Sequence, residues 1–250
     1  MILTAAAIGL SVASGLALAG PPEGLLLELV FVDHQGTAAE QQSTRVRVLA
    51  SGDVQTADAS GNLSTRFRMT PGQVASLQRD IFGSQQLATI DSSRLARSLD
   101  SACRTTGLSP RIEGSGSTVI RWQAGEQSGE VGCHALSVMA ARFPDFPEVQ
   151  RLIDCQLRLQ NVAAVADAGG YEAAEQFAKI ANNHLQQQHP DTQPLQSEEL
   201  SMYRSLSTGN RYIQFYRRPL GDRAELIVSL FDSPGQPPRV EVLATPATER

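Results

Sequence analysis

Three cysteines are the residues of this chain best suited to nucleophilic chemistry, and one of them, Cys133, stands directly before a histidine. A cysteine nucleophile needs a general base within hydrogen-bond reach and surroundings that favour the thiolate. Residues 130–133 are expected to form a strand, and neighbouring residues of a strand point to opposite faces of the sheet. Cys133 and His134 are therefore expected to point apart, and the pair does not predict a catalytic centre.

The spacing of Cys103, Cys133 and Cys155 matches no Cys-x-x-Cys signature of a zinc or redox site. In an exported protein a pair of cysteines can oxidise, and a set of three then leaves one thiol over. Two interpretations stay open. Either Cys103 and Cys133 form a disulfide while Cys155 stays free on an apolar helix face, or all three thiols are reduced and buried as small hydrophobic groups.

Other patterns that can indicate chemistry are incomplete. Residues 113–117 (Glu-Gly-Ser-Gly-Ser) resemble a phosphate-binding loop in composition, but they lack a third glycine and a Lys-Thr/Ser ending, and a strand is expected to follow them. The sequence has no Gly-x-Ser-x-Gly nucleophile elbow, and His34, His184 and His189 lack the spacing of metal ligands. The chain is therefore expected not to be an enzyme, and no catalytic residue, cofactor or metal ligand is predicted.

The first two thirds of the chain read as strands with covering helices. Apolar runs or apolar–polar alternation predict strands at residues 24–33, 43–49, 65–69, 118–122 and 130–133. A helix start is expected at Thr70, which caps, with Gln73 reaching back to complete a capping box. Residues 91–106 are either a second helix or an irregular loop, and residues 147–166 show the three–four spacing of a long helix. This pattern predicts an α+β domain over residues 20–166, with an antiparallel sheet covered by helices.

The last third of the chain reads as one helix followed by three strands. The helix begins after Gly169 and Gly170 and ends before Pro190, and its apolar residues recur as a single stripe. Period-two alternation predicts strands at residues 211–216, 224–231 and 240–242. A helix that must bury one stripe beside antiparallel strands is expected to pack across their sheet. Residues 167–250 are therefore predicted to form a second α+β domain.

The order of these C-terminal features resembles the cystatin family over about a third of the chain. The features are the Gly-Gly pair, the helix with Phe177, Ala178 and Asn183, the Gly209-x-x-Tyr212 motif, and a last strand that ends at Pro246. Cystatins wrap a sheet around one helix and inhibit papain-like cysteine proteases. The resemblance therefore implies a helix-and-antiparallel-sheet fold and a protein or peptide partner.

The inhibitory wedge of cystatins consists of an N-terminal glycine, a Gln-x-Val-x-Gly hairpin and a Pro-Trp hairpin. Carried over by the resemblance, the glycine is Gly170 or its neighbour, and the second hairpin begins at Pro246. The first hairpin comprises Ser205, Leu206, Ser207, Thr208 and Gly209. Serines replace the family's Gln and Val, and Ala247 replaces its Trp, so the resemblance implies a binding surface with weak inhibitory power.

The net charge of −5 and the isoelectric point of about 5.4 argue against nucleic acid or an anionic membrane as a partner. Residues 1–19 form an apolar run that ends in Ala17-Leu18-Ala19, which is typical of a signal-peptide cleavage site, although no Lys or Arg precedes Arg45. An uncleaved membrane anchor and a buried structural segment are the alternatives. No later stretch is long and apolar enough to span a membrane, so export to the periplasm or the extracellular space is expected.

These observations together predict an exported, non-catalytic envelope protein with a binding or assembly role. A cystatin-like inhibitor of papain-like cysteine proteases is the first alternative. A secreted hydrolase of unfamiliar type is the second.

The mature chain is expected to begin at Gly20, because small residues occupy the cleavage positions just before it. N-terminal sequencing of the native protein measures this directly. Recovery of intact Met1 from a membrane fraction would show an anchor instead.

Overall fold

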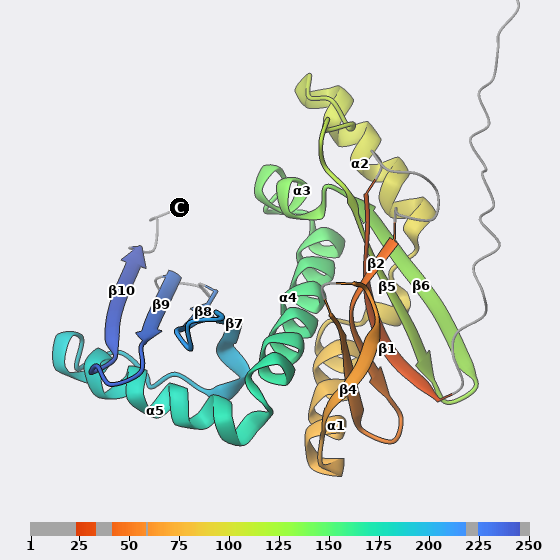
Figure 1. Cartoon of the computed structure of the whole chain (residues 1–250). Coiled ribbons are helices and arrows are strands. Elements are labelled where there is room, and N and C mark those ends of the chain that lie inside the picture. The colour runs from red at the N-terminus through yellow and green to blue at the C-terminus, as the bar shows by residue number, and fades with distance from the viewer. Residues whose placement is uncertain (1–23, 34–41, 59, 219–224, 246–250) are drawn as a thin grey trace, which may run out of the picture.

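The computed structural model describes residues 24–33, 42–58, 60–218 and 225–245 of the chain. Within them the chain forms two antiparallel sheets with one long helix standing between them (Figure 1). The predicted α+β class is confirmed, since strands and helices are not regularly alternated and every strand pairing is antiparallel. No helix of the described part is long and apolar enough to cross a membrane.

The first sheet has six strands in the order β4-β3-β2-β1-β5-β6. Their bounds are β1 Leu25–Val32, β2 Gln42–Leu49, β3 Asp53–Ala57, β4 Leu63–Arg68, β5 Ser117–Ala124 and β6 Gln127–His134. The segment between β4 and β5 consists of α1 Pro71–Gln78, the π-helical turn η1 Arg79–Ser84, the short η2 Leu87–Thr89 and α2 Ser92–Thr106. Residues 91–106, for which helix and loop were both open, are thus helical, and the capping box of Thr70 and Gln73 is present at the start of α1.

The second sheet has four strands in the order β10-β9-β8-β7. It is preceded by the helices α3 Leu136–Arg142, α4 Pro147–Ala168 and α5 Tyr171–Gln188. Its elements are η3 Ser197–Glu199, β7 Leu200–Ser205, β8 Arg211–Arg217, β9 Glu225–Asp232 and β10 Arg239–Thr245. The sequence predicted three of these strands and missed β7, whose polar and exposed second half hides the period of two.

Strand register separates the two sides of the six-stranded sheet. Leu27 and Leu29 of β1 pair with Val48 and Val46 of β2, and these side chains lie on the side that the helices cover. Thr56, in the row of Val46, donates a hydrogen bond to Asp167 of α4 at 3.0 Å, which fixes that side as the helix-facing one. The side chains of Glu28 and of the residues opposite it, Arg47 and Arg121, therefore point to the other, outer side of the sheet.

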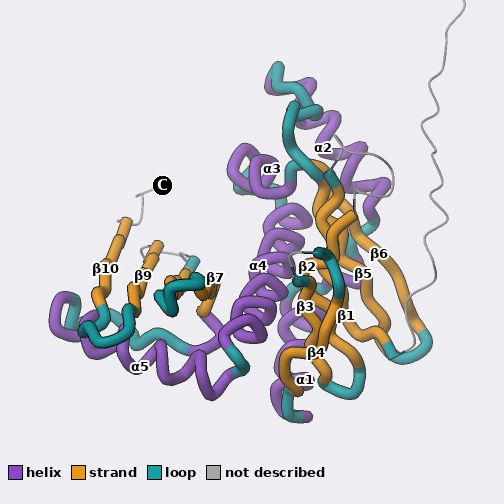
Figure 2. The backbone as a smooth tube through the Cα atoms, viewed as in Figure 1, coloured by secondary structure: helices purple, strands orange, loops and turns teal. Residues whose placement is uncertain are grey.

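α4 is the element that both sheets share. It contacts β2 and β3 of the six-stranded sheet and β7 of the four-stranded sheet, and Figure 2 shows it between the two sets of strands. Residues 162–166 are all buried, which requires cover around the whole circumference of the helix. The predicted boundary between residues 166 and 167 falls in the last turn of α4, and the buried side chains of both sheets form one connected cluster.

A ladder of charged side chains crosses the outer side of the six-stranded sheet. Glu28 of β1 is only 1% exposed and lies opposite Arg47 of β2 and Arg121 of β5. Its carboxylate accepts hydrogen bonds from Arg47 at 2.7 Å and from Arg121 at 3.0 Å. Arg121 also pairs with Glu130 of β6 at 3.4 Å. The one polar residue in the apolar run of β1 is thus a buried carboxylate with a guanidinium on each side.

Replacing Glu28 with leucine should destabilise the protein by about 3 kcal/mol, because it leaves two partly buried guanidinium groups without their partner. The triple variant Glu28→Leu, Arg47→Met, Arg121→Met should recover most of this loss, since a well-packed apolar replacement removes the desolvation cost of all three charges. Urea unfolding measures both values. A triple variant that is as unstable as Glu28→Leu would show that the ladder does not act as one unit.

Candidate functional site

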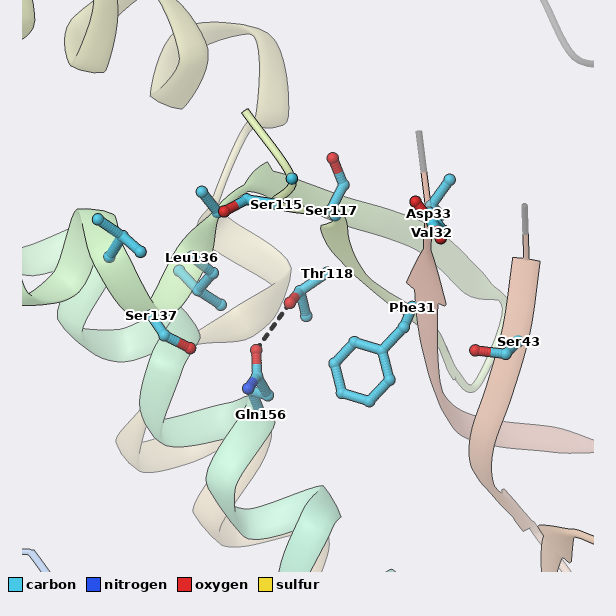
Figure 3. A pocket seen from close by; sticks show the side chains of 14 residues that line it. Phe31, Val32, Asp33, Ser43, Ser115, Ser117, Thr118, Leu136, Ser137 and Gln156 are labelled. Carbon is cyan, nitrogen blue, oxygen red and sulfur yellow. Dashed lines mark hydrogen bonds between the residues drawn. The ribbon is translucent and has the colours of Figure 1, made fainter. Parts of the chain in front are cut away.

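A cavity of about 480 Å³ opens at one end of the six-stranded sheet (Figure 3). The end of β1, the beginnings of β2, β5 and α3, and the middle of α4 surround it. Its lining consists of Phe31, Val32, Asp33, Ser43, Gly114, Ser115, Gly116, Ser117, Thr118, Ala135, Leu136, Ser137, Val138 and Gln156. The volume lies within the range of pockets that hold small molecules.

Strand register places a row of side chains on the helix-facing floor of this cavity. Phe31 of β1 lies opposite Ser43 of β2 on one side and opposite Thr118 of β5 on the other. Side chains of directly opposed residues in an antiparallel pair are close neighbours on the same face. The row Ser43–Phe31–Thr118 therefore offers one aromatic ring between two hydroxyl groups.

Gln156 of α4 meets this row from the opposite side. The Thr118 hydroxyl donates a hydrogen bond to Gln156 Oε1 at 2.7 Å, and the two residues are only 6% and 5% exposed. Within the described residues, the other end of the Gln156 carboxamide makes no hydrogen bond. The buried side-chain atoms without a hydrogen-bond partner in the described residues are Trp122 Nε1 and Arg151 Nε, so the free end of Gln156 is open to the cavity that it lines. The cavity thus presents a polar group that a ligand can bind.

Two backbone features hold the walls of the cavity. The chain at Gly116 runs so close to β1 that a Cβ atom there would lie 2.5 Å from the carbonyl oxygen of Val32. Ala135, between β6 and α3, has a φ of +49°, which costs a non-glycine residue roughly 1 kcal/mol. Its N–H donates to the carbonyl of Gly116 at 2.9 Å. This hydrogen bond keeps the start of α3 against the 114–118 segment.

The charge of the described lining limits the chemistry of the site. Among the described lining residues hydroxyl groups are the most frequent polar groups, Asp33 is the single charged side chain, and Lys, Arg, His and Cys are absent. No group of three potential metal-ligating side chains occurs in the described part of the chain. The described lining residues therefore include hydrogen-bonding groups for a polar molecule, but neither a cationic partner for a phosphate nor a histidine or lysine base beside a nucleophile.

The cysteines and His134 are not among the described lining residues, although Cys133 lies opposite Thr118 and His134 lies opposite Ser117 in the β5–β6 pair. All three thiols are free and buried, so of the two interpretations the structure has the reduced one, and the Cys103–Cys133 disulfide is not formed. Burial raises the pKa of Cys133 to about 11 and that of Cys155 to about 12, which opposes thiolate formation. His134 Nε2 accepts a hydrogen bond from the N–H of Ile112 at 3.2 Å.

The structure distributes the residues suggested by the cystatin resemblance over separate places. Gly170 is buried between α4 and α5, where a Cβ atom would lie 3.5 Å from the Phe67 ring of β4. Residues 205–209 form the end of β7 and its turn into β8, and Leu206 is 55% exposed there. Pro246 lies outside the described residues. The loop that touches this turn is the one between β9 and β10, since a Cβ atom on Gly209 would lie 3.2 Å from Pro234 Cγ.

Sequence reasoning missed Gln156 and Thr118. One signal for Gln156 was available, because it follows Leu152 by four residues and precedes Leu159 by three, and a polar residue on a buried stripe needs a partner. In the sequence the glycines at positions 114 and 116 indicate only an incomplete phosphate loop. Their place beside β1 depends on a strand pairing that the local pattern does not specify.

The fold and the cavity define a two-sheet α+β protein with a polar, small-molecule-sized site. Comparisons of the chain with protein-family models, with curated proteins and with solved structures give no match. The arguments about function therefore depend on the site itself.

The three thiols should not react with a thiol reagent such as DTNB in the native protein, and all three should react in concentrated guanidinium chloride. Burial holds the pKa of Cys133 above the ordinary value of 9.0, so the unfolded chain releases this proton first. The free energy of unfolding should consequently decrease as the pH rises above 9.0. Thermal unfolding across this range should show a smaller alkaline loss for Cys133→Ala. Fast labelling of a native thiol would contradict the burial described above.

Proposed function

We propose that this protein is an exported, non-catalytic binding protein whose cavity takes a small, uncharged, polar ligand. The observation that carries the proposal is the Thr118–Gln156 pair, which is almost completely buried and leaves one end of a carboxamide unpaired at the cavity. Residues 1–19, on which the expectation of export depends, lie outside the described residues.

The described lining, whose single charged side chain is the exposed Asp33, supports a ligand without negative charge. A phosphate or carboxylate group would find no cationic partner among the described lining residues and would lose its hydration, which is costly. An uncharged ligand with hydroxyl or amide groups loses less and can exchange hydrogen bonds with the serine and threonine hydroxyls and with Gln156. Such a cavity, mostly preformed and with a few converging polar groups, is the usual form of a small-molecule site.

The lining also supports a role without catalysis. Acyl or glycosyl transfer needs a nucleophile with a base, or two carboxyl groups set across the scissile bond. The described lining contains one carboxyl group, that of Asp33, and no histidine or lysine. The secreted hydrolase that the sequence left open therefore has no support from this cavity.

A second candidate function is protein binding at the turns of the four-stranded sheet. The β7–β8 turn carries the exposed Leu206 and touches the β9–β10 turn at Pro234. The cystatin resemblance implies a binding hairpin at the β7–β8 turn, and Leu206 is its exposed apolar residue. Inhibition of papain by the whole chain that is lost in Leu206→Ser would favour this candidate over the cavity.

Gln156→Leu should weaken binding of the cavity ligand about tenfold, which corresponds to about 1.4 kcal/mol and to the loss of one or two neutral hydrogen bonds. Saturation-transfer NMR with a mixture of uncharged metabolites and with charged controls (inorganic phosphate and glutamate) identifies binders. Titration of the best binder then compares the variants.

Gln160→Leu is the matched control, because Gln160 lies on the same helix but outside the cavity lining, and it should bind as the wild type does. Binding of phosphate or glutamate in place of uncharged compounds would overturn the proposal. Equal affinity of the wild type and Gln156→Leu would overturn it as well.

A further inference from the structure

We infer that the ligand of the cavity is a neutral saccharide, with one face of its pyranose ring against Phe31. This inference depends on the proposed function, since it names the chemical class that the same cavity takes. It follows from the arrangement of one aromatic ring, one carboxamide and several hydroxyl groups around a space of about 480 Å³.

The ring of Phe31 is the only aromatic group among the lining residues that the structure describes. It is partly buried, and Figure 3 shows it beside the Thr118–Gln156 hydrogen bond, with Ser43 beyond it. A pyranose ring has an axial face of C–H groups and an equatorial rim of hydroxyl groups. The C–H face can cover the Phe31 ring, whose negative π face attracts the positively polarised hydrogens.

The polar groups suit the hydroxyl rim of such a ring. A carboxamide both donates and accepts, so the unpaired end of Gln156 can bind one hydroxyl of a sugar in either orientation of the amide. Ser137 lies on the other side of Gln156 from Phe31 and adds a group that also donates and accepts (Figure 3). A ligand surrounded by this many dual-character groups must carry dual-character groups of its own, and sugar hydroxyls are of that kind.

Asp33, an exposed residue of the lining, can also bind the hydroxyl groups of a sugar. Its carboxylate only accepts hydrogen bonds, and two adjacent hydroxyl groups of a sugar can donate to its two oxygens. An amine ligand would also suit a carboxylate and an aromatic ring through charge attraction. Asp33 is exposed, however, while the buried end of the cavity at Thr118 and Gln156 is neutral, which favours a neutral ring placed inside.

Saturation-transfer NMR with the full chain tests the inference with four probes: glucose, N-acetylglucosamine, choline and acetamide. A neutral sugar should bind, with the largest saturation on the ring protons of one pyranose face. Phe31→Leu should weaken its binding about three- to tenfold, while Phe31→Tyr should retain it, because the aromatic face remains. Phe146→Leu is the control, since Phe146 is also a partly buried phenylalanine but lies outside the lining.

The outcomes separate the inference from the proposed function. Binding of acetamide without any sugar would overturn the saccharide inference and leave the binding function in place. Preferential binding of choline would overturn the inference in favour of an amine. Absence of binding by all four probes overturns the inference, and an intact Gln156-dependent response to other uncharged metabolites would show that the binding function survives. Equal sugar affinity in wild type and Phe31→Leu would show that no ring stacks on Phe31.

Discussion

The burial of α4 on two sides is the constraint on which the rest of this structure depends. One side of the helix covers the six-stranded sheet, the other side lies against β7, and residues 162–166 leave no side of its last turns for solvent. A helix that is apolar all round must be enclosed. The two sheets therefore cannot pack separately without exposing part of α4, and their buried side chains form a single core.

This enclosure also explains why a polar residue in the middle of α4 matters. Gln156 is 95% buried, so most of its side chain is removed from solvent and its carboxamide is stabilised by a partner inside the protein. Thr118 satisfies one end of the carboxamide. The cavity lies beside this pair, and both residues are part of its lining.

On the outer side of the six-stranded sheet a buried charged group likewise has its partners inside the protein. Glu28 is buried between Arg47 and Arg121, and each guanidinium reaches over it from a neighbouring strand. The ladder specifies the register of three strands, because a shift by one residue would move the carboxylate to the helix-facing side among Leu27 and Leu29. The register that this ladder favours is also the one that brings Phe31 beside Thr118. Strand pairing, cavity floor and charge ladder are thus linked.

The sequence by itself determined the elements whose signals are local. Periodicity predicted most of the strands and the long helices, the Thr70–Gln73 capping box predicted the start of α1, and the layout predicted the α+β class. It did not predict β3, β7 or α3, because these elements are short and α3 begins at a non-glycine residue with a positive φ. The cystatin resemblance stays a prediction of the same local kind, made from the order of motifs.

Only the tertiary structure decided which residues form the site. Phe31, Thr118 and Gln156 are separated by 87 and 38 positions in the chain, and they meet because β5 pairs with β1 and α4 crosses their common face. The pairing of β1 with a strand so distant in sequence depends on long-range burial and on the opposed charges of Glu28 and Arg121. Local periodicity specifies which face of a helix or strand is buried, but not which other element packs against that face. The packing of the complete core determines these pairings, and the site forms only when they are in place.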